Sequence, residues 1–116
     1  MYSLKANVLE GCPYSENLIT LLDGKNIPVE YKRIKYIDKE KYKTSEIRTF
    51  PQVYLQRNNK KLFLIGGFDD MNYILNIIKL NKFETIKKNI SNKFPDWNNK
   101  NVLRLIQLLA KTTLPS

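Results

Sequence analysis

Residues 4–22, "LKANVLEGCPYSENLITLL", surround the chain's only cysteine with a strand pattern, a turn and a helix pattern. Apolar side chains alternate along residues 4–9, which predicts a short strand. We expect a helix from Pro13 onward, because a proline at the first helical position lacks only an N–H group that the helix would leave unpaired. Cys12 thus falls in a strand-to-helix turn, where the positive end of the helix dipole favours a thiolate over a thiol.

Downstream of this turn, strand and helix patterns alternate in an order that predicts an α/β fold. Residues 29–37 form a second alternating stretch, and the charged residues 38–47 are expected to be a short helix or irregular. Residues 50–67 predict a β-hairpin around the turn-forming residues 57–60. A helical stripe follows at Met71, Ile74, Leu75 and Ile78. The order β-α-β-α-β-β-α predicts a central mixed four-stranded sheet flanked by helices.

The C-terminal part of the sequence differs in composition from the rest. We therefore divide the chain into a domain of residues 1–82 and a basic, mostly helical extension of residues 83–116. Within the extension, residues 101–111 predict an amphipathic helix. Its apolar positions are Val102, Leu105, Ile106 and Leu109. We expect the extension to be packed on the domain or appended to it, and Phe94 and Trp97 are its expected anchors.

The cysteine and histidine content limits the chemistry of the chain. One cysteine and no histidine exclude an internal disulfide, the usual Cys/His zinc clusters within one chain, and hydrolases with a histidine base. A lone cysteine is typical of a reducing compartment, so we expect a cytoplasmic protein. No apolar run approaches the roughly 20 residues of a membrane helix. The N-terminus lacks the pattern of a secretory signal, so no membrane partner is expected.

The chain is strongly basic, with 20 Lys+Arg against 11 Asp+Glu and a formal net charge of +9. Such a charge fits nucleic acid or a small anionic substrate. However, the sequence is also rich in Asn and Ile, and an A/T-rich coding bias would raise the lysine content without any partner. The basic residues are scattered along the chain rather than confined to one segment. Nucleic acid is therefore not the expected partner.

Three motifs, in this order, carry a resemblance to a known family. They are CPYS (12–15), TFPQVYL (49–55) and IGGFDD (65–70). Together they resemble the glutaredoxins, a branch of the thioredoxin fold, over residues 4–82. The resemblance implies a thioredoxin-like sheet and a glutathione-dependent thiol–disulfide oxidoreductase. Serine at the fourth place of CPYS is similar to the monothiol members of the family.

The resemblance implies roles for residues around the cysteine and the proline motif. Cys12 is the expected nucleophile, and Tyr14 is expected to lie over the thiol and glutathione. The TFP motif implies a cis peptide bond before Pro51, next to Cys12. There the backbone of Phe50 would pair with the cysteinyl unit of glutathione like a short added strand.

The glycine-aspartate turn is the third expected binding element. Its glycines permit a close approach of the ligand, and the N–H groups that open the next helix can meet a carboxylate. An aspartate can meet an ammonium group, and we expect Asp69 or Asp70 to be the N-cap of the helix. The resemblance assigns the γ-glutamyl end of glutathione to Gly67, Phe68, Asp69 and Asp70.

Pro13 and Ser15 are expected to support the active site. Backbone donors at Tyr14 and Ser15, with the Ser15 hydroxyl, are expected to stabilise the Cys12 thiolate. Because no second cysteine can close an internal disulfide, we expect a monothiol ping-pong reaction that removes glutathione from mixed disulfides.

The residues before the cysteine depart from the family pattern. The family usually has a lysine where this chain has Leu9, and the adjacent Glu10 works against thiolate formation. Arg48, near the proline motif, is expected to supply the missing positive charge to the glycine carboxylate of glutathione.

Two other functions stay open. In the first, Cys12 and the cysteine of a second chain would ligate a [2Fe–2S] cluster together with two glutathiones, since such a cluster needs four thiolates. In the second, the chain is a weakly active thioredoxin-like adaptor that uses its basic extension for a partner. For the oxidoreductase we expect a monomer whose partners are glutathione and glutathionylated proteins or small mixed disulfides, with no resident metal.

Overall fold

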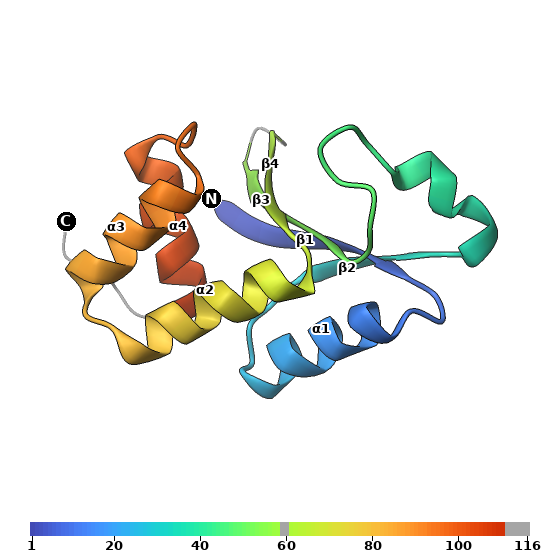
Figure 1. Cartoon of the computed structure of the whole chain (residues 1–116), viewed down its shortest axis with the longest axis horizontal. Coiled ribbons are helices and arrows are strands. Elements are labelled where there is room, and N and C mark those ends of the chain that lie inside the picture. Colours follow the sequence, from blue (N-terminus) through green and yellow to red (C-terminus); the bar gives the residue numbers. More distant parts are fainter. Residues whose placement is uncertain (59–60, 111–116) are drawn as a thin grey trace. The chain divides into compact units, whose positions relative to one another are not determined.

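In the computed structural model, which describes residues 1–58 and 61–110, the first part of the chain is built around a four-stranded sheet (Figure 1). The strands are β1 (Tyr2–Leu9), β2 (Glu30–Ile34), β3 (Gln52–Arg57) and β4 (Leu62–Gly66). They lie in the order β2-β1-β3-β4. β1 is parallel to β2 and antiparallel to β3, which is antiparallel to β4. The sheet is therefore mixed, and β3 and β4 form the predicted hairpin; residues 59 and 60 of its turn lie outside the described residues.

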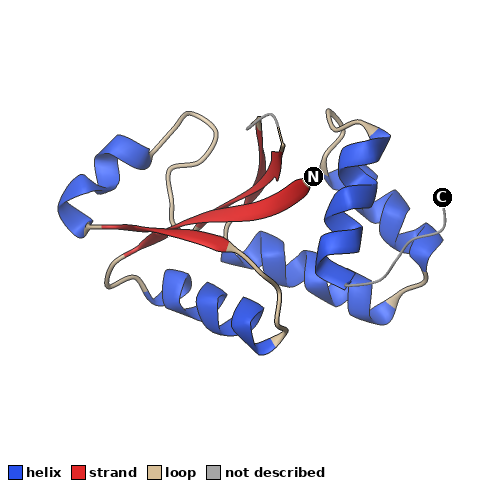
Figure 2. Ribbon diagram, turned by 180° about the vertical axis from the view of Figure 1, so that it is seen from behind, coloured by secondary structure: helices blue, strands red, loops and turns tan. Residues whose placement is uncertain are grey.

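The structure describes four α-helices, of which the one over residues 83–93 was predicted only as part of a mostly helical extension. They are α1 (Pro13–Gly24), α2 (Phe68–Leu80), α3 (Phe83–Lys93) and α4 (Asn99–Ala110), with a 3₁₀ helix, η1 (Tyr36–Tyr42), between β2 and β3. Figure 2 shows α1 lying along one face of the sheet. None of the helices that the structure describes is long and apolar enough to cross a membrane.

Alternating burial along β1 explains how α1 is positioned. Leu4, Ala6 and Val8 are buried, as the alternation predicted, while the residues between them are partly exposed. Leu18 and Leu22 of α1 have no exposed surface at all. Because burying apolar side chains is the main favourable contribution to folding, this packing fixes α1 against the sheet. Residues 10–12 therefore form a short turn from the end of β1 to the first residue of α1.

The segment between β2 and β3 is partly helical and partly irregular. A short helix or an irregular stretch was predicted for residues 38–47, and the 3₁₀ helix η1 begins before that range, at Tyr36, and ends at Tyr42. The hydroxyl of Thr44 accepts the N–H groups of Glu46 and Ile47, at 3.2 and 3.0 Å. This local bonding competes with helix formation. The chain therefore runs without regular structure from the end of η1 to β3.

The chain divides into two compact units, Met1–Met71 and Asn72–Ser116, so their border falls within α2. The predicted border between residues 82 and 83 stays a prediction. In the second unit α3 and α4 pack against each other. Their buried apolar residues are Ile86, Ile90, Val102, Leu105, Ile106 and Leu109. The predicted stripe of α4 is thus confirmed as buried; Lys111, which the prediction included, lies outside the described residues.

Tyr31 of β2 provides a test of alkaline stability. Burial raises the pKa of Tyr31 to about 12, the Asp23 carboxylate adds to the shift, and Arg33 opposes it. Its hydroxyl is buried without a hydrogen-bond partner in the described residues. The folded chain keeps the phenol neutral to a higher pH than the unfolded chain, so stability present below about pH 10 is lost as pH rises towards about 12.

Replacing Tyr31 by phenylalanine should remove this part of the alkaline loss, because the variant has no phenol to ionise. At neutral pH we expect an unchanged or slightly higher free energy of unfolding, since no hydrogen bond is lost. Urea unfolding of both proteins at neutral pH and at about pH 11 measures the difference. An equal alkaline loss in the two proteins would show that Tyr31 does not contribute to it.

Candidate active site

Cys12 occupies the N-cap position of α1, directly before Pro13. Gly11 makes the turn out of β1 with a φ of +75°, a backbone conformation that glycine adopts without steric cost. The N–H of Cys12 donates to the carbonyl of Leu9 at 3.2 Å, and its own carbonyl accepts the N–H of Glu16 at 3.1 Å. The half-buried side chain therefore lies at the positive end of α1, where unpaired N–H groups favour a negatively charged sulfur.

The proline motif lies beside this cysteine. The peptide bond between Phe50 and Pro51 is cis, as the resemblance implied. The Phe50 carbonyl oxygen lies 3.9 Å from Cys12 Sγ and is the acceptor for its thiol. Folding thus brings together two motifs that are 38 residues apart in the sequence.

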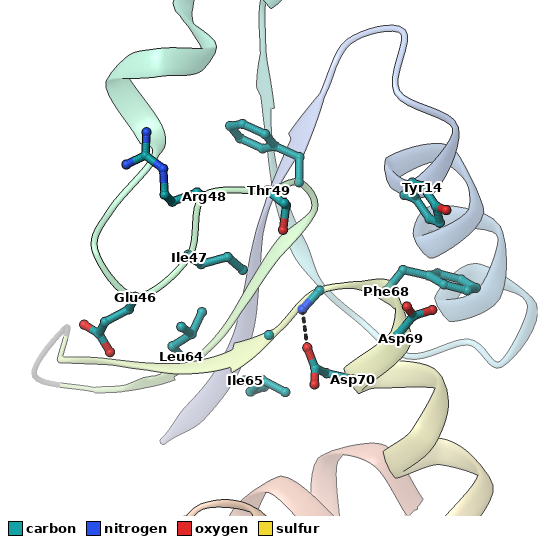
Figure 3. Close-up of a pocket in the computed structure, with 13 residues that line it drawn as sticks. Tyr14, Glu46, Ile47, Arg48, Thr49, Leu64, Ile65, Phe68, Asp69 and Asp70 are labelled. Carbon is teal, nitrogen blue, oxygen red and sulfur yellow. Dashed lines mark hydrogen bonds between the residues drawn. The ribbon is translucent and has the colours of Figure 1, made fainter.

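A cavity of about 530 Å³ extends from this point between two segments of the first unit. Residues 46–50 line one side, and residues 64–70 together with Tyr14 line the other. Figure 3 shows Arg48 and Glu46 on one side of the cavity and Phe68 and Asp69 on the opposite side. Its volume is in the usual range for small-ligand sites, about 300–1,000 Å³.

Most of the predicted binding residues line this cavity. They are Tyr14, Arg48, Phe50, Gly67, Phe68, Asp69 and Asp70. Cys12 and Pro51 are not lining residues, but both adjoin Phe50. The structure thus brings the three motifs together.

The glycine-aspartate turn has a different capping arrangement from the one expected. α2 begins at Phe68, so Gly67 is the N-cap, and the prediction of an aspartate at that position was wrong. The Asp70 carboxylate accepts the N–H of Gly67 at 2.9 Å (Figure 3). This is the bond by which an acidic side chain at the third helical position caps a helix. Asp69 is exposed, and the acceptor of this bond is Asp70.

Close contacts fix the path of the turn past the proline. A Cβ atom at Gly67 would lie 3.4 Å from the carbonyl oxygen of Pro51. Gly66 has a φ of +138°, and a Cβ atom there would overlap the Asp70 carboxylate. The turn therefore depends on glycine at position 66, whereas a Cβ atom at position 67 would make an ordinary van der Waals contact.

Two aromatic rings border the cavity on the α1 side. The rings of Tyr14 and Phe68 have centroids 6.5 Å apart and are tilted by 50°. This geometry is within the range of favourable aromatic pairs. Tyr14 keeps 59% of its surface exposed, so its ring is accessible to a ligand in the cavity.

Ser15 has a structural partner that the sequence did not reveal. Its side chain is fully buried, and its hydroxyl oxygen accepts the N–H of Leu9 at 2.9 Å. The bond joins the end of β1 to the first turn of α1 across Cys12. Ser15 therefore helps to hold the cysteine turn, whatever its effect on the thiolate.

Sequence reasoning missed several residues that line the cavity. Glu46, Ile47 and Thr49 lie on the irregular segment before β3, where no periodic pattern marks them. Leu64 and Ile65 were recognised only as strand residues. Glu46 also affects β3, because burial raises the pKa of Tyr54 and the Glu46 carboxylate adds to that shift.

The glutaredoxin family model matches residues 1–59, which is just over half of the chain. The chain belongs to the glutaredoxin family. The solved structure of glutaredoxin 1 from Francisella tularensis, in complex with cacodylate, is similar to it with a TM-score of 0.53. The two chains are 21% identical, and the match covers 70% of this chain and all of the Francisella chain. A search of curated proteins found no match.

Family membership supports a thiol–disulfide oxidoreductase function and confirms the predicted fold. This glutaredoxin has a thioredoxin-like mixed sheet and C-terminal helices, and its family consists of thiol–disulfide oxidoreductases that use glutathione. The family match ends before the glycine-aspartate turn of residues 65–70. The roles of individual residues in this glutaredoxin are therefore proposals.

Proposed function

We propose that this glutaredoxin removes glutathione from mixed disulfides by a monothiol ping-pong reaction with Cys12 as the nucleophile. The observation that carries the proposal is the position of the chain's only thiol. Cys12 lies at the N-terminus of α1 and next to the Phe50 carbonyl, where the cavity begins. No second cysteine is present to resolve an intermediate, so glutathione must be the resolving thiol.

The reaction has two thiol–disulfide exchanges. In the first, the Cys12 thiolate attacks the glutathione sulfur of a mixed disulfide, forms a Cys12–glutathione disulfide and releases the substrate as a thiolate. In the second, a glutathione thiolate attacks the glutathione sulfur of this adduct, releases the Cys12 thiolate and leaves oxidised glutathione. Each step forms one S–S bond and breaks one. In sum, one mixed disulfide and one glutathione give the substrate thiol and one oxidised glutathione.

The cavity offers complementary groups for the two ends of glutathione. On one side, the Arg48 guanidinium is available to the glycine carboxylate. On the other, the N-terminus of α2 at Phe68 and the exposed Asp69 are available to the carboxylate and ammonium of the γ-glutamyl end. The Phe50 backbone would pair with the cysteinyl unit between them, and the Tyr14 ring would cover the adduct.

We propose Arg48 as the positive charge that replaces the lysine expected at Leu9. Arg48→Ala should raise the apparent KM for glutathione about 3- to 10-fold, a modest effect because the arginine is exposed. Steady-state assays with varied glutathione measure the change. Lys25→Ala, which removes an exposed lysine that does not line the cavity, serves as the control. An equal rise in both variants, or no rise in Arg48→Ala, would contradict the assignment.

The two aspartates of the turn should separate binding from stability. Asp70→Ala should lower the free energy of unfolding by about 1 kcal/mol, because the Gly67 N–H loses its acceptor. Asp69→Ala should leave stability within about 0.5 kcal/mol but raise the KM for glutathione, because the ammonium loses its counterion. Urea unfolding and steady-state kinetics of both variants test this division, which fails if Asp69→Ala alters stability more than Asp70→Ala.

The proposed reaction predicts an isolable intermediate. Exposure to oxidised glutathione should add one glutathione to the intact protein, and reduced glutathione should remove it. Intact-mass spectrometry before and after each treatment measures the adduct, and peptide mapping locates it at Cys12. Absence of an adduct under these conditions would refute the proposal and leave only the family assignment.

The alternative functions remain predictions. Cys12 supplies one of the four thiolates that a [2Fe–2S] cluster needs, so that function requires a second chain. No contact in the described residues favours it over thiol transfer. We propose a monomer acting in a reducing compartment on glutathionylated proteins or small mixed disulfides.

A further inference from the structure

The two units of the chain differ in charge, which the scattered order of basic residues in the sequence conceals. Residues 72–116 contain eight basic and two acidic residues, a formal charge of +6. Residues 1–71 contain twelve basic and nine acidic residues, a formal charge of +3. Basic residues are about equally frequent in both units. The higher positive charge of residues 72–116 therefore comes from their small number of acidic residues. A coding bias towards lysine would not remove acidic residues from one unit.

The basic side chains of the second unit are available to an external anion. Lys79, Lys82, Lys88 and Lys100 are exposed, and none has a carboxylate partner among the residues that the structure describes. The ion pairs of Lys5, Lys41 and Lys43 all lie in the first unit. Unpaired exposed lysines are the groups that neutralise phosphates.

The packing of α3 and α4 argues against a lipid surface as the source of those phosphates. A helix that binds a bilayer surface presents an apolar face to the acyl chains. Here most of the apolar residues of α3 and α4 are buried, none of the others is fully exposed, and the two helices pack on each other (Figure 1). Among the described residues of this unit, Leu80 at the end of α2 is the only large aliphatic residue that is exposed.

An aromatic and basic cluster adds a second kind of contact. Phe94 and Trp97 stack with centroids 4.2 Å apart and an angle of 15°. Lys93 Nζ lies 5.4 Å from the centre of the Tyr73 ring and 5.8 Å from that of Phe94. Tyr73 is 50% exposed, and the rings of Phe94 and Trp97 are half-buried. Aromatic rings beside lysines are the features on which unpaired nucleobases stack.

We propose that residues 72–110 form a binding surface for single-stranded nucleic acid. The exposed lysines contact phosphates without reading sequence, and the cluster of Tyr73, Lys93, Phe94 and Trp97 stacks on bases. The inference is independent of the thiol chemistry at Cys12. It gives the C-terminal helices a role beyond packing.

Trp97 provides a direct readout, because it is the only tryptophan in the chain. The full chain is titrated with a single-stranded DNA oligonucleotide of about 20 nucleotides at low salt. We expect the oligonucleotide to change the Trp97 emission, and binding to weaken steeply as salt rises. No binding at low salt, or binding without any change in Trp97 emission, would overturn the proposal. Equal or tighter binding to phosphatidylserine vesicles would overturn it in favour of a lipid surface.

A charge-reversal variant tests the location of the surface. In the full chain, Lys82→Glu, Lys88→Glu and Lys100→Glu together should weaken oligonucleotide binding about tenfold or more and flatten its salt dependence. Circular dichroism and the rate of thiol transfer check that the variant is folded. Should it fail to fold, the corresponding glutamine variant carries the test.

A matched control separates local contacts from the net charge of the protein. Lys25→Glu, Lys35→Glu and Lys41→Glu reverse three exposed lysines of the first unit and change the net charge by the same amount. We expect this control to weaken binding less than about threefold, because phosphate contacts dominate affinity. An equal loss in both variants would show that only the general positive field attracts the oligonucleotide, and would refute a surface in the second unit.

Discussion

Replacing Cys12 by serine is expected to reduce thiol transfer to the rate of the uncatalysed reaction. The serine hydroxyl remains protonated at neutral pH and forms no disulfide, and the chain has no other cysteine to take over. The assay is the release of glutathione from a small mixed disulfide, with glutathione reductase and NADPH as the readout. Cys12→Ala should give the same result, because both variants lack the sulfur.

The loss should be chemical rather than structural. The half-buried Cys12 side chain makes only a long contact, of 3.9 Å, with the Phe50 carbonyl. The free energy of unfolding, measured in urea, should therefore change by less than about 1 kcal/mol. Thiol transfer above the buffer rate in either variant would contradict the nucleophile assignment. A large loss of stability would make the activity result uninformative for serine and leave the alanine variant as the decisive one.

Gly66→Ala is expected to have the largest effect on stability, lowering the free energy of unfolding by about 3 kcal/mol. Its φ of +138° is a conformation that other residues rarely adopt, and the added Cβ would overlap the carboxylate of Asp70. Asp70 would have to move from the Gly67 N–H. We therefore expect the variant also to lose affinity for glutathione, because the turn that borders the cavity would be displaced.

The other glycines of the first unit provide controls for this prediction. At Gly24, the last residue of α1, an added Cβ meets no atom within 4 Å. Gly24→Ala should therefore be neutral or stabilising by up to about 1 kcal/mol. Gly11 is also open but has a φ of +75°, so Gly11→Ala should fall between the two, with a cost of about 1 kcal/mol. Urea unfolding gives the order, and a Gly66→Ala protein as stable as Gly24→Ala would refute the steric argument.

The sequence by itself determined the parts of this protein that depend on neighbouring residues. The alternation along β1 and the proline at the start of α1 placed Cys12 at a helix N-terminus, because strand and helix periodicities and the proline ring act locally. The apolar alternation around a turn likewise predicted the β3–β4 hairpin. The sole cysteine then limited the chemistry to one thiol per chain.

Only the tertiary structure decided which distant groups meet. It placed the Phe50 carbonyl beside Cys12, the Ser15 hydroxyl on the Leu9 N–H, and the Asp70 carboxylate on the Gly67 N–H. The sequence predicted a mostly helical extension but not the bounds of α3, because only two positions of this polar segment, Ile86 and Ile90, are buried apolar sites. Most of these features depend on contacts between segments far apart in the chain. The apolar face of α3 is buried only because α4 packs on it. No local pattern encodes such contacts, because apolar surface is removed from water only when two segments pack against each other.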